Sequence, residues 1–334
     1  MPAYFGLDIG STSIKIIQSD GNRVKEIAIG ANSTGKSIPQ MSNAEKISFA
    51  DQLKSLIKDT GMKSKQVVAS IPESSVFSRV LKFPFMSTPE LATAIKWELD
   101  QSVPFPPNEI ETSWTVLERP KKFEGNEKIS VYVVAVPTNI SETYVQMLEL
   151  IGLEPIRLEN EIPSLVRSFG SILSDESPSA ILDLGANGTN MVISGKEKIF
   201  GSFYVPVGGQ ALTRLIVESF NLPLDQAENY KRTYGLDNSK LEGKMVTVIM
   251  PVLDNIMGEL KKMMISYKGE HQDSSVRRLI LTGGGAYLMG LVPYLSESLG
   301  GVEVVLGNPF ATMAVEEKYK GLGPVFAIAN GLAL

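Results

Sequence analysis

An aspartate near the start of the chain lies in an apolar run that ends directly before a turn of glycine and hydroxyl residues. The run covers Phe5 to Ile9 and contains Asp8, the turn follows at Gly10 to Ser13, and a second β-prone run extends from Ile14 to Gln18. This pattern predicts a strand, a tight turn and a returning strand better than it predicts a helix.

A turn of this kind could bind phosphate, because it exposes several backbone N–H groups and hydroxyls that together form an anion nest. The carboxylate of Asp8 would repel a phosphate bound there. A bridging Mg²⁺ ion, which takes carboxylate and phosphate oxygens as ligands, would remove that conflict. A plain hairpin with a solvated aspartate is the alternative that this stretch alone leaves open.

The chain repeats the same arrangement in its second half. An apolar strand containing Asp183 leads into the small polar turn Gly185 to Gly188, and the β-prone residues Met191 to Ser194 follow. A third, glycine-rich turn comes after the apolar run Leu279 to Leu281, at Thr282 to Ala286. Two facing Asp hairpins and a later glycine turn could hold a polyphosphate from both sides, with a metal ion between the acids.

This order of motifs resembles the actin-like ATPase superfamily of sugar kinases, Hsp70 and actin. Within it, the chain is most similar to the FtsA-like PilM family of type IV pilus assembly, which has relatives in type II secretion. The stretch Ala227 to Gly235, with Glu228 and Lys231, is similar to a signature of that family. The resemblance implies an α/β, actin-like (ribonuclease H-like) two-domain ATPase fold with an inserted small α+β subdomain.

The resemblance also implies an ATP and Mg²⁺ site. Asp8 and Asp183 would hold Mg²⁺ largely through water, and either could position an attacking water. The other implied nucleotide contacts are Gly10, Ser11, Thr12, Ser13 and Lys15 at the β-phosphate, Gly185, Asn187 and Thr189 at the γ-phosphate, Gly208, Gly209, Gly283, Gly284 and Gly285 at phosphate, ribose and base, and Glu228 and Lys231 at the nucleoside.

Two pairs of these residues can also be judged from the sequence without the resemblance. Gly208 and Gly209 precede an expected helix from Gln210 to Phe220, so backbone N–H groups should point outward at a helix start. Glu228 and Lys231 could instead be a surface i,i+3 pair worth a few tenths of a kcal/mol.

Residues Gly30 to Ser37 match the P-loop pattern G-x-x-x-x-G-K-[ST]. A true P-loop runs straight into a helix whose N-terminus holds the phosphates. Here Pro39 biases Ile38 away from the helical region, and the preceding strand belongs to an expected meander. We therefore expect a polar loop here and no phosphate site.

Composition excludes several classes of protein. The 334 residues are 43% hydrophobic, carry a net charge of −5 and include no cysteine. This length suggests two or more domains, and the charge gives no reason to expect nucleic acid as a partner. The absence of cysteine fits a reducing cytoplasm. No uncharged apolar run approaches the ~18 residues that span a bilayer, so we expect a soluble protein without direct membrane insertion.

Strand and helix signals give the elements that must position these motifs, and the resemblance implies how those elements group into domains. We expect a first actin-like domain at 1–77 and 153–178, a second at 179–323 with a subdomain at about 207–272, and a last helix at 324–334 packing back on the first. Residues 78–152 would form the inserted module. Its expected elements are a strand Val80 to Phe85, a helix ending at Gln101, strands Glu111 to Glu118 and Lys128 to Val136 around a charged loop 121–127, and a helix Ser141 to Ile151. A further helix is expected from Glu159 to Leu173.

The resemblance implies a partner as well as a nucleotide. A groove between the inserted module and the first domain would take the short cytoplasmic N-terminal tail of a PilN-like inner-membrane protein, placing this chain in the cytoplasm, peripheral to the membrane. Trp97, Val103, Phe105 and Trp114 are the candidate apolar contacts, unless they form the module's own core. Pilus motor ATPases and self-association are further possible partners.

Three classes of function therefore remain open. The first is a nucleotide-switched assembly protein with at most weak ATPase activity. The second is a small-molecule, sugar-type kinase of the same superfamily, although no convergent set of polar groups for a sugar stands out in the inserted module. The third is a P-loop motor, which depends only on Gly30 to Ser37.

Overall fold

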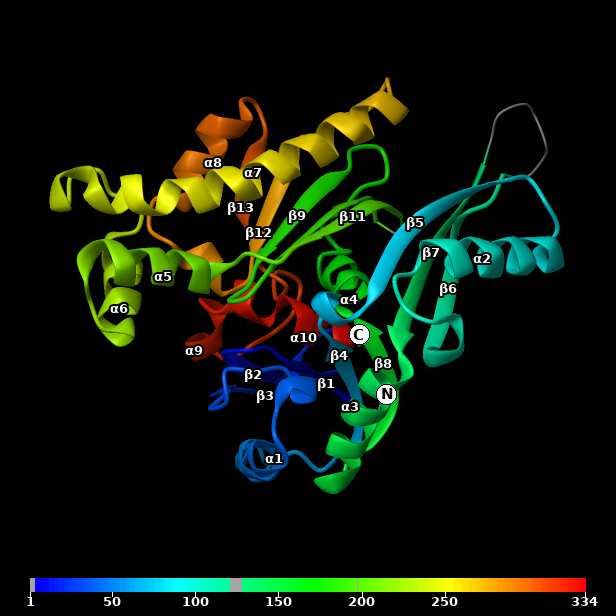
Figure 1. The fold of residues 1–334 in the computed structure, drawn as a ribbon, viewed down its shortest axis with the longest axis horizontal. Helices are drawn as coiled ribbons and strands as arrows, with labels where there is room; N and C mark the ends of the chain where they lie inside the picture. Colours follow the sequence, from blue (N-terminus) through cyan, green and yellow to red (C-terminus); the bar gives the residue numbers. More distant parts are fainter. Residues whose placement is uncertain (1–3, 121–127, 197) are drawn as a thin grey trace.

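The computed structural model describes residues 4–120, 128–196 and 198–334, so the charged loop expected at 121–127 lies outside the described residues. The described chain contains two five-stranded sheets and one three-stranded sheet. In Figure 1 the two large sheets lie one above the other, and the three-stranded sheet stands beside them.

The first sheet has the strand order β3-β2-β1-β4-β8. β1 (Tyr4–Ile9), β2 (Ser13–Ser19) and β3 (Val24–Ala31) form the expected antiparallel meander, and β4 (Gln66–Ile71) and β8 (Glu154–Asn160) add to it in parallel. The helix α1 (Asn43–Asp59) starts at a capping box, in which the hydroxyl of Ser42 accepts from the Glu45 N–H. β1, which carries Asp8, is therefore the central strand of its sheet.

The helix predicted from Glu159 to Leu173 exists, but both of its predicted ends are wrong. Residues up to Asn160 form β8, which pairs in parallel with β4, and the helix α4 covers only Glu161–Ser168. The missed strand is short, charged and at the sheet edge, so its alternating apolar residues give only a weak strand signal.

The second sheet repeats the topology of the first, with the order β11-β10-β9-β12-β13. Its strands are β9 (Ser179–Leu184), β10 (Thr189–Ser194), β11 (Ile199–Val205), β12 (Arg278–Thr282) and β13 (Glu303–Leu306). The helices of this half are α5 (Gly209–Phe220), α6 (Leu224–Tyr234), α7 (Lys244–Glu270) and α8 (Leu291–Leu299). Asp183 therefore lies on the central strand of the second sheet, just as Asp8 lies on the central strand of the first.

The helices α4 and α10 (Ala327–Leu332) lie between the two sheets, as Figure 1 shows in the middle of the molecule. They share one apolar core with strands of both sheets, including Val68, Ile181 and Ile280. α10 touches β1 so closely that a Cβ on Gly6 would lie 2.3 Å from the Ala329 carbonyl oxygen. The last helix therefore packs back on the first sheet, as expected, after the short helix α9 (Glu317–Lys320).

The inserted module has its own sheet, in the order β5-β7-β6, and its own apolar core. It consists of β5 (Phe77–Pro84), α2 (Thr88–Ser102), β6 (Ile110–Glu118) and β7 (Lys128–Pro137). The next helix, α3 (Thr138–Leu150), was expected to close this module but packs elsewhere. Its residues Tyr144, Met147 and Leu148 are buried in the core of the first sheet. Judged by this packing, the inserted module ends near residue 137, where β7 ends, and not at residue 152.

None of the helices in the described ranges combines the length and the apolar character needed to cross a membrane.

Candidate functional site

The two Asp hairpins have the same turn. The Gly10 N–H donates to the Ser13 carbonyl over 3.0 Å, and the Gly185 N–H donates to the Gly188 carbonyl over 3.0 Å. In the strand register, Asp8 stands opposite Lys15 and Asp183 stands opposite Asn190. The sequence repetition is therefore a structural repetition, and the two hairpins differ in the side chain that faces each acid.

Asp8 is buried, with 3% of its surface exposed, and both of its oxygens have partners. The Lys15 ammonium donates to Oδ2 over 2.9 Å, and the Ser70 hydroxyl of β4 donates to Oδ1 over 3.1 Å. Lys15 was expected at the β-phosphate, but here its charge is paired with Asp8. The pair depends largely on its mutual attraction, because Asp8 is buried and Lys15 is only slightly exposed to water.

Among the described residues, no lysine bonds directly to Asp183. The Asn190 amide donates to its Oδ2 over 3.3 Å. Burial, together with the negative charge of Asp8, raises the pKa of Asp183 to about 6, although Lys15 and Asn190 act in the opposite direction. The third glycine turn reaches this carboxylate, since a Cβ on Gly283 would lie 2.7 Å from Asp183 Oδ1.

A third carboxylate, Glu161, joins these two and was missed in the sequence. It is the first residue of α4, and its Oε2 accepts from the Glu73 N–H over 3.1 Å and from the Asn190 amide over 2.8 Å. Burial of the carboxylate, and the charges of Asp8 and then Asp183, raise its pKa to about 8. The wrong helix start hid Glu161; with α4 beginning at 161, it is an acid in a first helical turn.

This cluster fits a divalent cation and a phosphate. Lys15 bonds only Asp8 of these three carboxylates among the described contacts, and burial and the neighbouring acids raise the pKa of Asp183 and of Glu161. The carbonyl oxygen of Asn190 is buried without a hydrogen-bond partner. Mg²⁺ prefers such carboxylate and amide oxygens and usually keeps waters. Within the described residues, no three acidic, histidine or cysteine side chains could hold an ion alone, so water and phosphate would supply the remaining ligands.

The residues of the first turn lie at the surface of the site. Thr12 is exposed, and Ser11 and Ser13 are half-buried. The turn is held from outside by Asn32, whose amide donates to the Gly10 carbonyl over 3.0 Å and whose N–H donates to the Thr12 carbonyl over 3.0 Å. These turn residues are therefore accessible from solvent, and their contact with a phosphate stays a prediction.

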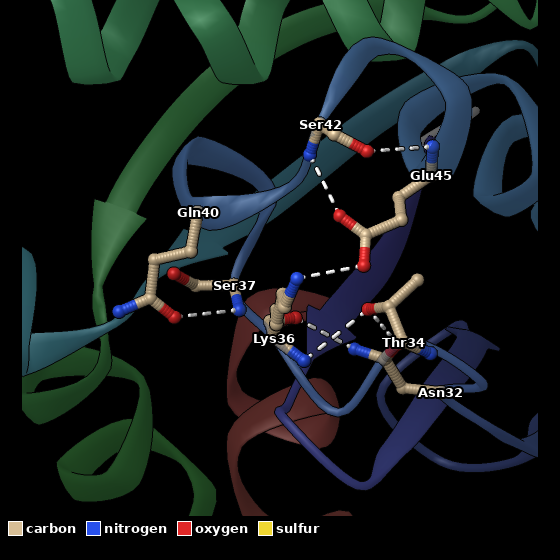
Figure 2. Close-up of polar contacts among 7 residues, drawn as sticks. All are labelled: Asn32, Thr34, Lys36, Ser37, Gln40, Ser42 and Glu45. Carbon is tan, nitrogen blue, oxygen red and sulfur yellow. Dashed lines mark hydrogen bonds and ion pairs between the residues drawn. The ribbon is translucent and has the colours of Figure 1, made fainter.

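Asn32 belongs to the stretch that matches the P-loop pattern, and Figure 2 shows how that stretch is built. The Lys36 ammonium donates to Glu45 Oε1 over 2.7 Å, and the Lys36 N–H donates to the Thr34 hydroxyl over 3.2 Å. The preceding β3 is antiparallel, and only a 3₁₀ turn, Ile38–Gln40, follows. The stretch is a polar loop that supports α1 and the first hairpin, as expected.

Two expectations for the second hairpin are wrong. The N–H groups of Gly209 and Gln210 do not point outward: they donate to the carbonyls of Gly185 and Ala186 over 2.9 and 2.8 Å. The hairpin turn docks on the start of α5, so close that a Cβ on Gly208 would lie 2.5 Å from the Gly185 oxygen. Thr189 is fully buried, and its hydroxyl donates to the Val207 carbonyl over 2.7 Å.

These glycines and Thr189 therefore fix the hairpin to α5, and their roles are positioning roles. The remaining residue expected at the γ-phosphate, Asn187, is exposed at the tip of the turn. Gly284 and Gly285 follow Gly283 in the third turn, and a Cβ on Gly284 would meet no atom within 4 Å.

Glu228 and Lys231 are more than a surface pair. The Lys231 ammonium donates to Glu228 Oε2 over 2.7 Å, to the Thr213 hydroxyl over 2.9 Å and to the Gly209 carbonyl over 3.0 Å. The pair fastens α6 to the start of α5, next to the second hairpin. A contact of these two side chains with a nucleoside stays a prediction.

A hollow of about 540 Å³ lies between the inserted module and the first sheet. It is lined by Glu111 of β6, by one face of α3 and by β8; the α3 and β8 residues are Ser141, Glu142, Val145, Gln146, Pro155, Ile156, Arg157 and Leu158. We call it the docking hollow.

The four apolar residues expected at the groove are not among those that line the docking hollow. Trp97 is 62% exposed on α2. Val103 and Trp114 pack against the module's own core, and Phe105 is half-buried elsewhere. For Val103 and Trp114 the structure supports the alternative that they belong to the module's own core. A partner contact of Trp97 or Phe105 stays a prediction.

Comparison with known proteins adds to this geometry. A family model described as "Type IV pilus assembly protein PilM" matches residues 6–334. The solved structure "PilM-PilN type IV pilus biogenesis complex" is 27% identical with a TM-score of 0.85, covering 99% of this chain and 98% of that chain. MreB 5 of Spiroplasma citri bound to AMPPNP is 12% identical with a TM-score of 0.56, covering 98% of this chain and 94% of that chain.

Among curated proteins, the cell division protein FtsA of Borreliella burgdorferi is 25% identical over 226 residues, which is 61% of this chain and 54% of that protein. The chain spans about half the length of the curated relatives it matches.

Proposed function

Because the chain belongs to the PilM family of type IV pilus assembly proteins, we propose that it is a nucleotide-binding component of the assembly platform at the inner membrane. In this proposal it binds ATP with Mg²⁺ between the two Asp hairpins and docks the cytoplasmic N-terminal tail of a PilN-like membrane protein. The observation that carries the proposal is the match along 99% of the chain to the structure of a PilM–PilN complex.

The carboxylate cluster supports the nucleotide part of the proposal. Asp8, Asp183 and the free carbonyl oxygen of Asn190 are the groups that would hold the ion, directly or through water. A bound Mg²⁺ supplies positive charge for both the carboxylates and the phosphates. Glu161 is held by the Glu73 N–H and the Asn190 amide, and with a pKa of about 8 it carries a proton at neutral pH that it can donate. We expect at most weak ATPase activity.

The docking hollow supports the partner part. It lies between two edge strands, β8 of the first sheet and β6 of the module sheet. An edge strand presents unpaired backbone groups, to which an extended peptide can add as a further strand. Val145, Leu158 and Ile156, which is 49% exposed, offer apolar contacts for alternate side chains of such a peptide.

The charges at the docking hollow agree with a tail that emerges from a membrane. Glu111 and Glu142 line it, with Arg157 as the opposing charge. Cytoplasmic segments next to a transmembrane helix carry an excess of lysine and arginine. Such a tail brings positive charge to this acidic rim and places the chain at the cytoplasmic face of the membrane. Pilus motor ATPases and further copies of this chain are additional partners in the proposal.

The test is binding of a synthetic peptide of the PilN-like tail to the purified chain, followed by fluorescence anisotropy. Ile156→Asp places a charge in the docking hollow at a partly exposed position, so folding should be kept while the affinity falls about ten-fold or more. Ile265→Asp is the matched control, because Ile265 is 71% exposed on α7. Equal loss in both variants, or no binding to the wild type, would contradict the proposal.

A sugar-type kinase is the alternative from another class. The family match gives it no support, and a screen of sugar acceptors with Mg·ATP would detect it directly.

A further inference from the structure

A second hollow, of about 400 Å³, lies between the inserted module and the second half of the molecule. β5 runs beside β11 here, as Figure 1 also shows. The lining residues that matter below are Lys82, Leu117 and Glu118 on the module and Lys198, Phe200 and Glu270 on the other side.

Two ion pairs cross this second hollow. Lys82 of β5 pairs with Glu270 at the end of α7, and the Lys198 ammonium donates to Glu118 Oε1 over 2.8 Å. We call these two pairs the clasp. All four side chains are between one third and about one half exposed. Exposed pairs of this kind shift an equilibrium by about five-fold at most, so the clasp can open and close at small cost.

The strand β6 connects the clasp to the docking hollow. Glu111, near its start, lines the docking hollow, and Leu117 and Glu118, at its end, line the second hollow. At about 3.3 Å per residue, seven steps along a strand cover roughly 23 Å. β6 pairs with β7 along this length, with one irregularity between Val116 and Glu118, so the strand moves as a unit with its sheet.

The other side of the clasp is connected to the second Asp hairpin. β10 begins at Thr189, directly after the hairpin turn, and ends at Ser194, four residues before Lys198. β10 and β11 are paired antiparallel, with a register shift at Ser194. A displacement of the Asp183 hairpin therefore reaches Lys198 through a single buried strand.

We infer that the clasp couples the docking hollow to the nucleotide site. This rests on the proposed function, because the coupled sites are the ones proposed there. Nucleotide between the hairpins moves the second half of the molecule against the first. The clasp transmits that movement to the module, and β6 transmits it to the wall of the docking hollow. A nucleotide that favours either the paired or the unpaired state of the clasp thus changes the affinity for the tail.

The test compares the affinity for the tail peptide with and without Mg·ATP in clasp variants. In the wild type we expect the two affinities to differ by up to about five-fold, the most that an exposed ion pair contributes. Glu118→Lys and Lys198→Glu each place like charges together and should bring the ratio close to one. The double variant restores an opposite pair and should restore the ratio. Lys262→Glu is the matched control, because its pair with Glu259 lies within α7.

Because the chain contains no cysteine, the clasp can also be held shut chemically. Glu118→Cys with Lys198→Cys, joined by a short bis-methanethiosulfonate reagent, should abolish the effect of Mg·ATP on peptide affinity, and reduction should restore it. Nucleotide binding, followed by calorimetry, should persist throughout.

The outcomes separate the two ideas. A wild type that does not bind the peptide refutes the proposed function. A wild type that binds with equal affinity in both conditions refutes the coupling. If the single variants and the cross-linked protein keep the wild-type ratio of peptide affinities with and without Mg·ATP, the coupling exists but does not depend on the clasp.

Discussion

Replacement of Glu161 by glutamine should stabilise the free protein at alkaline pH. Burial and the charges of Asp8 and Asp183 raise the pKa of Glu161 from 4.5 to about 8. The folded chain therefore holds a proton on Glu161 over a pH range in which the unfolded chain has released it. By linkage, the wild type loses stability as the pH rises from about 4.5 toward 8. Glutamine stays neutral and can still accept from the Glu73 N–H.

The magnitude follows from the same two values. At about 1.4 kcal/mol per pKa unit, the difference between 4.5 and about 8 corresponds to roughly 5 kcal/mol. Part of the Glu161 surface remains exposed while its carboxylate is enclosed, and its charge is coupled to two other acids. We therefore expect the free energy of unfolding of Glu161→Gln to exceed that of the wild type by about 2–3 kcal/mol at pH 8.5. Near pH 4.5 the two proteins should be equally stable.

The assay is urea denaturation of both proteins between pH 4.5 and 8.5, followed by circular dichroism without nucleotide. Asp183→Asn is a useful comparison, because the pKa of Asp183 is raised only from 3.8 to about 6. The difference in the free energy of unfolding between Asp183→Asn and the wild type should reach its full value by about pH 6. The difference for Glu161→Gln should still increase up to about pH 8. Parallel stability curves for wild type and Glu161→Gln would refute the reasoning, since they would mean that the Glu161 charge meets no penalty.

Three further outcomes are expected. Asp8→Ala and Asp183→Ala should each weaken Mg·ATP binding in calorimetry, and unchanged affinity in folded variants would exclude this site. Lys36→Ala should leave ATP affinity nearly unchanged, because its ammonium is paired with Glu45; a large loss with intact stability would instead move the site to the P-loop match. Gly208→Ala should lower the free energy of unfolding by about 1–3 kcal/mol, because its Cβ would meet the Gly185 oxygen at 2.5 Å; thermal melting without a shift would contradict this.

The hairpins show what local sequence can determine. An apolar run, a glycine at the turn and a β-prone return specify a hairpin within about fifteen residues, since turn chemistry and side-chain alternation act between neighbours. Asp8 and Asp183 were therefore placed correctly on paired strands. The same reasoning predicted a polar loop around Lys36, because Pro39 is a local signal.

The partners of those hairpins were beyond the reach of local signals. Gly208 looks like the free start of a helix, but the N–H groups that follow it donate to the turn of the second hairpin, more than twenty residues earlier in the chain. Thr189 looks like a phosphate contact, yet its hydroxyl is bonded to Val207. Composition and periodicity carry no information on which distant carbonyl a donor meets.

The sequence by itself determined the two strand–turn–strand motifs, the acids they carry and the family resemblance that joins them. Only the tertiary structure brought Glu161 to Asp8 and Asp183, placed α3 and β8 opposite the inserted module, and paired Lys198 with Glu118. The reason is physical: hairpins form from contacts between near neighbours. The pKa of a buried acid, the wall of a hollow and an ion pair between domains depend instead on groups that meet only when the core is packed.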